Sequence, residues 1–129
     1  MRELNDHKVN PANDVLHVAA IDAPGSGGAN HAYRIKGFTE DNPGGYGPLG
    51  GGPVIITFQN GPIAEAGVNG VTHEVLLAIL CDRMRGFQAG PYHSADNAEA
   101  LACMEQAQAA LQRRTKARMA RGVEGTHVV

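Results

Sequence analysis

The sequence predicts an α+β fold, in which a small antiparallel β-sheet is followed by a two-helix antiparallel hairpin. Residues 1–71 contain thirteen of the seventeen glycines, six of the seven prolines and several short runs of β-forming residues. Residues 72–122 instead place apolar residues at three- and four-residue steps, the spacing of a helix face. At 129 residues the chain has about the length of one ordinary domain. We therefore expect one compact domain, with a β region over 1–71 and the hairpin over 72–129.

Three runs in the first part are predicted to form strands. Residues 14–21 and 30–38 alternate apolar and polar side chains, as half-buried strands do. Residues 53–59 contain consecutive β-forming residues. Asn60-Gly61 follows at once and is the dipeptide that best fits a type I′ turn. We therefore predict a hairpin in which residues 62–68 return antiparallel.

The glycine-rich segment 39–53 is expected to be a loop between strands. Inside it, residues 45–50 spell G-x-G-x-x-G. A dinucleotide-binding fingerprint follows a strand and opens a helix, whereas this segment precedes a strand. The pattern therefore favours a plain loop over a nucleotide cradle.

Two helices are expected in the second part. The first covers residues 72–88 with Thr72 as its N-cap, and the second is capped by Ser94 or Asp96 and ends near residue 121. Gly90-Pro91 separates them, and Gly122 stands where a C-terminal glycine belongs. The apolar face of the first helix consists of Leu76, Ile79, Leu80, Met84 and Phe87.

Charge is distributed unevenly along the chain. Residues 1–110 hold six Lys and Arg against twelve Asp and Glu, whereas residues 111–129 hold five against one. A mostly acidic body argues against a nucleic acid polymer as partner, because such binding needs many phosphate contacts. The compact basic end suits a small anion, since arginine forks match phosphate bidentately. The alternative is a solvated basic end that complements the helix dipole.

The sequence contains no signature of an enzyme, a metal site or a membrane protein. The six histidines share no metal-ligand spacing, and neither H-E-x-x-H nor G-x-S-x-G occurs. No apolar run approaches the roughly 20 residues of a spanning helix, and the N-terminus lacks the apolar stretch of a signal peptide. We therefore expect no catalytic residue, metal, cofactor or membrane partner. Phe87 fits core packing or a stacking platform for a base, and Asn97 fits a helix cap or an amide that reads a base edge.

At these residues the sequence resembles the first Thoeris anti-defence family of phage proteins. The resemblance rests on residues 59–63 (Gln-Asn-Gly-Pro-Ile), 67–71 (Gly-Val-Asn-Gly-Val), Phe87-Gln88 and Asn97. The segment 111–127 is its most specific part and resembles a helical-hairpin module shared with the second anti-CBASS family. The likeness covers about residues 53–127, and the glycine-rich loop departs from it.

The resemblance implies a sponge that does not act as a catalyst. Proteins of this family hold a cyclic ADP-ribose isomer that TIR enzymes make as an alarm signal, and so prevent activation of the Thoeris effector. Their pockets form at a dimer interface, and several members assemble dimers into hexamers. Hexameric members also take cyclic trinucleotides, and some cyclic dinucleotides, at separate sites. Such a protein acts in the cytoplasm of the infected bacterial host.

Site residues follow from the resemblance position by position. Phe87 would stack on the adenine, Asn97 would contact a polar edge of the ligand, and Arg114 and Arg118 would grip the pyrophosphate. The second site, for cyclic trinucleotides, would be lined by Arg121, Gly122, Val123 and Thr126.

Two other classes of function stay open at this point. An enzyme that hydrolyses the same ligand would need a general base near the arginines, and the candidates are Glu105, Glu124 and His127. A protein-binding inhibitor of the defence effector would use the hairpin as its interaction face.

Overall fold

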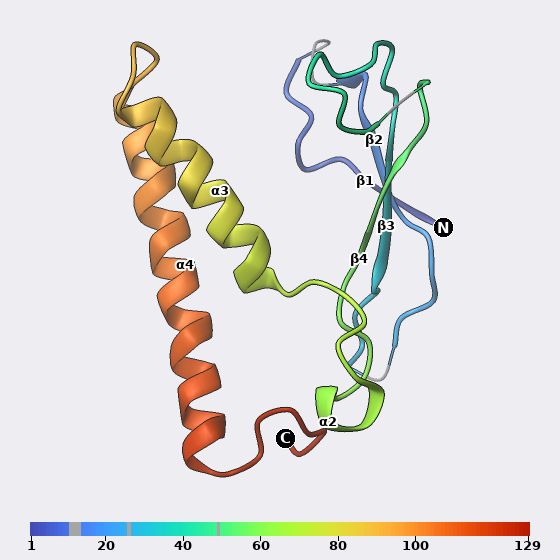
Figure 1. Cartoon of the computed structure of the whole chain (residues 1–129), viewed down its shortest axis with the longest axis vertical. Coiled ribbons are helices and arrows are strands. Elements are labelled where there is room, and N and C mark those ends of the chain that lie inside the picture. The colour runs from blue at the N-terminus through green and yellow to red at the C-terminus, as the bar shows by residue number, and fades with distance from the viewer. Residues whose placement is uncertain (11–13, 26, 49) are drawn as a thin grey trace. The chain divides into compact units, whose positions relative to one another are not determined.

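The chain folds into two units in the computed structural model, which describes residues 1–10, 14–25, 27–48 and 50–129. The first unit comprises residues 1–61 and 68–70 and holds the β-sheet, and the second comprises 62–67 and 71–129 and holds the helices (Figure 1). The sheet followed by a helical hairpin confirms the predicted α+β class.

The sheet is an antiparallel meander in the order β1-β2-β3-β4. Its strands are β1 (Arg2–Leu4), β2 (His17–Ala20), β3 (Ala32–Lys36) and β4 (Val54–Thr57). The three predicted strands are therefore confirmed, although each is shorter than its sequence pattern. Strand β1 was not predicted, because three residues are too few to show an alternation.

One face of the sheet carries the apolar side chains. Directly paired residues lie on the same face of an antiparallel sheet, and the rows on this face are Val18, Ile35 and Val54, then Ala20, Tyr33 and Ile56. The Tyr33 ring meets the Phe58 ring edge-on, with centroids 5.7 Å apart. This contact extends the apolar face beyond the end of β4.

The predicted hairpin after β4 is wrong. Residues 62–68 do not return as a strand, and the short helix α2 (Ile63–Ala66) forms there, with Pro62 as N-cap. Asn69 takes over the pairing that a return strand would have supplied: its Oδ1 accepts from the Asn60 N–H at 2.8 Å, and its Nδ2 donates to the Asn60 oxygen at 2.7 Å. A type I′ turn needs positive φ at two residues, and only Gly61 of the Asn60-Gly61 pair has it.

The glycine-rich segment 39–53 contains no helix or strand among its described residues, in agreement with the predicted loop. Leu49, one letter of the G-x-G-x-x-G match, lies outside the described residues. The match precedes β4 and no helix follows it directly, so it lacks the setting of a dinucleotide fingerprint.

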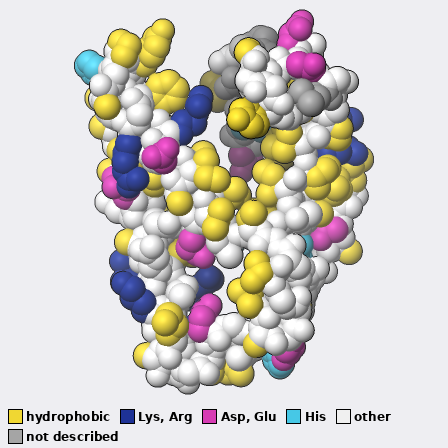
Figure 2. All heavy atoms as spheres, in the orientation of Figure 1, with side chains coloured by type: hydrophobic (Ala, Val, Ile, Leu, Met, Phe, Trp, Pro, Cys, Tyr) yellow, Lys and Arg dark blue, Asp and Glu magenta, His cyan; other side chains and the backbone are white. Residues whose placement is uncertain are grey.

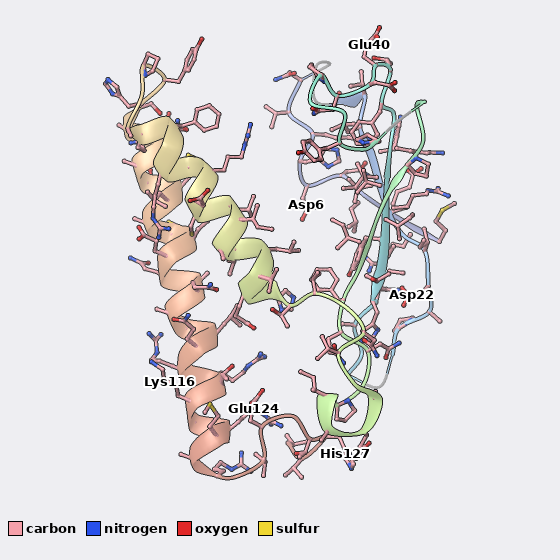
Figure 3. All side chains as sticks on the ribbon, viewed as in Figure 1. Asp6, Asp22, Glu40, Lys116, Glu124 and His127 are labelled. Atoms are coloured by element: carbon pink, nitrogen blue, oxygen red, sulfur yellow. The ribbon has the colours of Figure 1, made fainter. Side chains whose placement is uncertain are left out.

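Asp22 fixes the turn between β2 and β3 (Figure 3). Its carboxylate accepts hydrogen bonds from the main-chain N–H of His31 at 2.9 Å and of Ala32 at 3.2 Å, and from the Asn30 amide at 3.3 Å. Partial burial of the carboxyl raises its pKa, but these hydrogen bonds outweigh that effect, so the pKa of Asp22 lies below its ordinary value of 3.8.

We expect Asp22→Asn to destabilise the protein in a pH-dependent way. Because folding lowers the pKa of Asp22, its stabilising contribution is present above pH 3.8 and is lost as the pH falls through the folded-state pKa. The urea midpoint of the variant should therefore lie below that of the wild type at neutral pH, and the gap should narrow below pH 3.8. A gap that stays constant in acid would contradict this role of the carboxylate.

Two long helices, α3 (His73–Gln88) and α4 (Ala95–Ala120), form the hairpin. The Thr72 hydroxyl caps α3 by accepting from the Val75 N–H, and the Ser94 hydroxyl caps α4 by accepting from the Asn97 N–H. At the end of α4, Gly122 has a φ of +73°. The main-chain N–H groups of residues 122 and 123 donate to the oxygens of residues 119 and 118, which is a Schellman motif. Both predicted helices and their caps are confirmed.

The apolar face of α3 is only partly covered within one chain. Cys81 is buried on this helix, whereas Ile79 is 59% exposed, Leu80 48% and Val75 47%. We call Val75, Ile79 and Leu80 the α3 patch; apolar side chains exposed on the hairpin are visible in Figure 2. Two residues of the predicted apolar face, Ile79 and Leu80, are thus about half exposed in the single chain. No described helix combines the length and hydrophobicity that a membrane span requires.

Candidate ligand site of the helical hairpin

The tip of the hairpin is held by two amide side chains. The Gln88 amide donates to the Ser94 oxygen at 3.1 Å and accepts from the Ser94 N–H at 3.0 Å. Asn97 Nδ2 donates to the Tyr92 oxygen at 3.2 Å. Asn97 Oδ1 accepts no hydrogen bond from any described residue, so it can accept one from a ligand. The Asn97 side chain thus stabilises the turn through its amide nitrogen, and its oxygen has no partner among the described residues.

Phe87 lies at the same tip and is half-buried. The Arg83 guanidinium carbon lies 5.0 Å from the centroid of its ring, a cation–π contact that covers one ring face. The tip therefore places Phe87 and Asn97, the two residues assigned to base recognition, at one end of the hairpin.

The two arginines assigned to the pyrophosphate differ in their surroundings. Arg114 is exposed and makes no hydrogen bond or ion pair within the described part of the chain. The Arg118 side chain is only 22% exposed. It donates to Glu124 and to three main-chain oxygens of the segment that follows α4. Only Arg114 thus has its whole guanidinium available to a ligand.

Residues 122–128, which we call the tail loop, follow α4 and are ordered by hydrogen bonds. The Thr126 hydroxyl donates to the Val123 oxygen at 2.5 Å, and the Gly125 oxygen accepts from the Ala64 N–H of α2 at 3.0 Å. Glu124 and His127 are labelled in Figure 3. His127 pairs with Glu65 at 2.9 Å, and Arg121 donates to the Val129 oxygen at 2.9 Å. The residues assigned to the second site are thereby brought together, around a loop in contact with α2.

One chain does not bring together the residues assigned to the base and those assigned to the phosphates. Asn97 and Arg114 are seventeen positions apart on α4. At a rise of about 1.5 Å per residue they are separated by about 26 Å along the helix axis. A ligand of mononucleotide size cannot touch both ends of one hairpin.

Each candidate general base already has a polar partner: Glu105 and Glu124 are in ion pairs, and His127 lies beside a carboxylate. Glu105 pairs with Arg85 at 3.1 Å, and Glu124 pairs with Arg118 at 3.1 Å. His127 pairs with Glu65, as described above. No group of three metal-ligating side chains occurs in the described part of the chain. Each candidate base would have to leave its present partner to act on a ligand.

A cavity of about 520 Å³ in the first unit was not predicted. Its lining residues are His7, Val15, Leu16, Gly37, Phe38, Thr39 and Glu40. They come from separate segments whose meeting depends on the strand pairing, so no sequence pattern marks them.

Comparison with known proteins places the hairpin in a family. The family described as "Acb2/Tad1, hairpin domain" matches residues 52–116, half of the chain. The chain belongs to the Acb2/Tad1 hairpin-domain family. The match includes Phe87, Asn97 and Arg114, and it ends before Arg118 and the tail loop.

A curated relative gives a second comparison. "Thoeris anti-defense 1" of Bacillus phage SBSphiJ7 is 36% identical to the chain over 103 residues. The aligned segment is 80% of this chain and 65% of the relative, so it spans less than two thirds of the relative's length. This similarity confirms the resemblance seen in the sequence and supports the membership of this chain in the Acb2/Tad1 family.

Proposed function

We propose that this protein is a phage anti-defence sponge that binds the TIR-produced cyclic ADP-ribose isomer and sequesters it without cleaving it. Arg114 carries the proposal: it is a free guanidinium on a rigid helix within the segment that matches the family. A planar fork of this kind binds a pyrophosphate with charge-assisted hydrogen bonds. Phe87 and Asn97 supply the stacking surface and the hydrogen-bond acceptor that an adenine requires. The site of action is the cytoplasm of the infected bacterial host.

The pocket is built from two chains that run antiparallel. Because Asn97 and Arg114 lie about 26 Å apart on one helix, a single ligand contacts both kinds of residue only if they come from different protomers. Phe87 and Asn97 of one protomer then face Arg114 of its partner, with Arg118 beside it. A two-fold axis gives two such pockets in each dimer.

The α3 patch supports this arrangement because it lies near the expected axis. The midpoint between Asn97 and Arg114 falls at residues 105–106 of α4. Gln108 Nε2 of α4 donates a hydrogen bond to the main-chain oxygen of Glu74 at 3.0 Å. This contact places the start of α3 beside residue 108 of α4. The midpoint between Asn97 and Arg114 therefore lies beside residues 76–77 of α3. These residues fall between Val75 and the other two members of the α3 patch, Ile79 and Leu80. An exposed apolar patch at the axis is what a symmetric dimer seam needs.

The tail loop is the proposed second site. Three dimers assemble into a hexamer, and Arg121, Gly122, Val123 and Thr126 take a cyclic di- or trinucleotide there. The ordered loop, with its hydrogen bonds from Thr126 and to α2, supports a preformed site.

The existing partners of the candidate bases favour sequestration over hydrolysis. Glu105, Glu124 and His127 are exposed and already paired. A general base must reach the proton that it abstracts. Each of these groups would first have to give up a partner.

A capture-and-release assay tests the proposal. The protein is incubated with the cyclic ADP-ribose isomer, separated from free ligand and heat-denatured, and the supernatant is chromatographed. We expect intact ligand, at up to one molecule per chain, because a two-fold dimer has two pockets. Linear ADP-ribose would show an enzyme and contradict the proposal. Release of nothing, with a cyclic trinucleotide bound instead, would contradict the ligand assignment.

A further inference from the structure

The cavity of the first unit lies where three segments leave the same end of the sheet. Residues 15–16 precede β2 and residues 37–40 follow β3, and the pairing of His17 with Lys36 brings these two segments together. His7 belongs to the connection that follows β1, the neighbour of β2. The volume of about 520 Å³ falls within the range of about 300–1,000 Å³ that is typical of small-molecule sites. This end of the sheet therefore has room for one small molecule.

Two specific contacts shape the cavity. Gly37 has a φ of +110°, and a Cβ at this position would collide with the main-chain oxygen of Val15. Only glycine allows this close approach of the two segments. His7 Nε2 donates a hydrogen bond to the main-chain oxygen of Leu16 at 2.9 Å. This bond ties the connection after β1 to the segment that precedes β2.

The cavity combines an apolar wall with hydrogen-bond acceptors. Val15, Leu16 and Phe38 supply the apolar and aromatic surface. Because the main-chain oxygen of Leu16 carries no hydrogen, Nε2 of His7 is the protonated nitrogen, and Nδ1 of the neutral ring is an acceptor. The Glu40 carboxylate is a second acceptor. Neither acceptor has a hydrogen-bond or ion-pair partner among the described residues.

The charge of the lining selects against a phosphate. Among the described residues that line the cavity, Glu40 is the only carboxylate and none is Lys or Arg. Lys8 and Lys36 neighbour lining residues in the sequence but do not line the cavity themselves. A phosphate would be repelled by the carboxylate and would find no cation among the lining residues. An amino group, by contrast, supplies the hydrogens that the two acceptors lack.

We propose that this cavity binds an uncharged heterocycle with an exocyclic amino group, such as an unphosphorylated nucleoside. The amino group donates to the acceptors of His7 and Glu40, and the ring packs against Phe38. The inference does not depend on the proposed function. All the lining residues belong to the first unit, whereas Phe87 and Asn97 belong to the second.

The test is an NMR titration of the full chain with adenosine, in which the amide resonances of residues 7, 15–16 and 37–40 report binding at the cavity. Purine riboside, which lacks the amino group, and adenosine monophosphate, which adds a phosphate, are the comparison probes. We expect adenosine to bind at least about tenfold more tightly than either, because a ligand without a donor leaves the acceptors unpaired. Equal binding of either comparison probe would overturn the proposal. So would adenosine shifts that are confined to residues 87–97.

Glu40→Gln tests the carboxylate directly. Glu40 is exposed, so the variant should fold, and the amide keeps the size of the side chain but loses its charge. We expect adenosine to bind about fivefold more weakly, since hydrogen bonds to a charged acceptor are the stronger ones. Its preference over adenosine monophosphate should also shrink.

Glu3→Gln is the matched control, because Glu3 is an exposed residue of β1 outside the lining. It should leave all the affinities at the cavity unchanged. A Glu40→Gln variant that binds the probes as the wild type does would contradict the proposed site. Loss of binding of the cyclic ADP-ribose isomer would not affect these titrations, so the two proposals can fail separately.

Discussion

Arg114→Ala is expected to lower the affinity for the cyclic ADP-ribose isomer by more than about a hundredfold. Two charge-assisted hydrogen bonds at about 1.5 kcal/mol or more each account for about 3 kcal/mol, and every 1.4 kcal/mol is about tenfold in affinity. Because Arg114 has no hydrogen-bond or ion-pair partner among the described residues, the free energy of unfolding should change by less than about 0.5 kcal/mol. Calorimetry and a urea titration on the same sample measure both quantities.

Mixing two inactive variants tests whether the pocket is shared between protomers. Phe87→Ala and Arg114→Ala should each lose binding as pure dimers. In a mixed dimer, one pocket combines Phe87 of one protomer with Arg114 of its partner and is intact, whereas the other pocket lacks both. Co-expression should therefore restore about a quarter of the wild-type capacity, because half of the dimers are mixed and each has one intact site. A pocket formed within one chain would gain nothing from mixing.

Local rules predicted the helices well because their signals lie within a few residues of each helix end. Thr72, Ser94 and Gly122 mark the ends of α3 and α4, and the structure uses each one as predicted. The prediction of a hairpin turn at Asn60-Gly61 was wrong because of a contact with a residue distant in the sequence. The side chain of Asn69, nine residues away, supplies the hydrogen bonds that a return strand would have made.

The candidate site was predicted in composition but not in geometry. The separation of Asn97 from Arg114 could have been derived from the predicted helix, because both residues lie within it and the rise per residue is fixed. The difference in hydrogen-bond partners between Arg114 and Arg118 could not have been derived from the sequence. The partners of Arg118 are mostly main-chain oxygens, which carry no side-chain pattern, and their positions depend on the fold of the tail loop.

Ile79→Asp is expected to dissociate the dimer and abolish ligand binding. Ile79 is 59% exposed in the single chain, so aspartate there remains solvated in the monomer and the hairpin stays folded. In the dimer the interface would bury this carboxylate. Because the two protomers are related by a two-fold axis, two such carboxylates would be buried, one from each protomer. The cost is several kcal/mol for each buried ion, so dimer affinity should fall by at least about a thousandfold.

Ile55→Asp is the matched control for this change. Ile55 is 49% exposed and lies on β4 of the first unit, outside the α3 patch. Sedimentation equilibrium should give a monomer for Ile79→Asp and leave the assembly of Ile55→Asp unchanged, with the helical circular dichroism of both retained. A dimeric Ile79→Asp that still binds the ligand would place the seam on another face. Then the alignment of the α3 patch with the midpoint of α4 would have no bearing on assembly, although the distance between Asn97 and Arg114 would still require a second protomer.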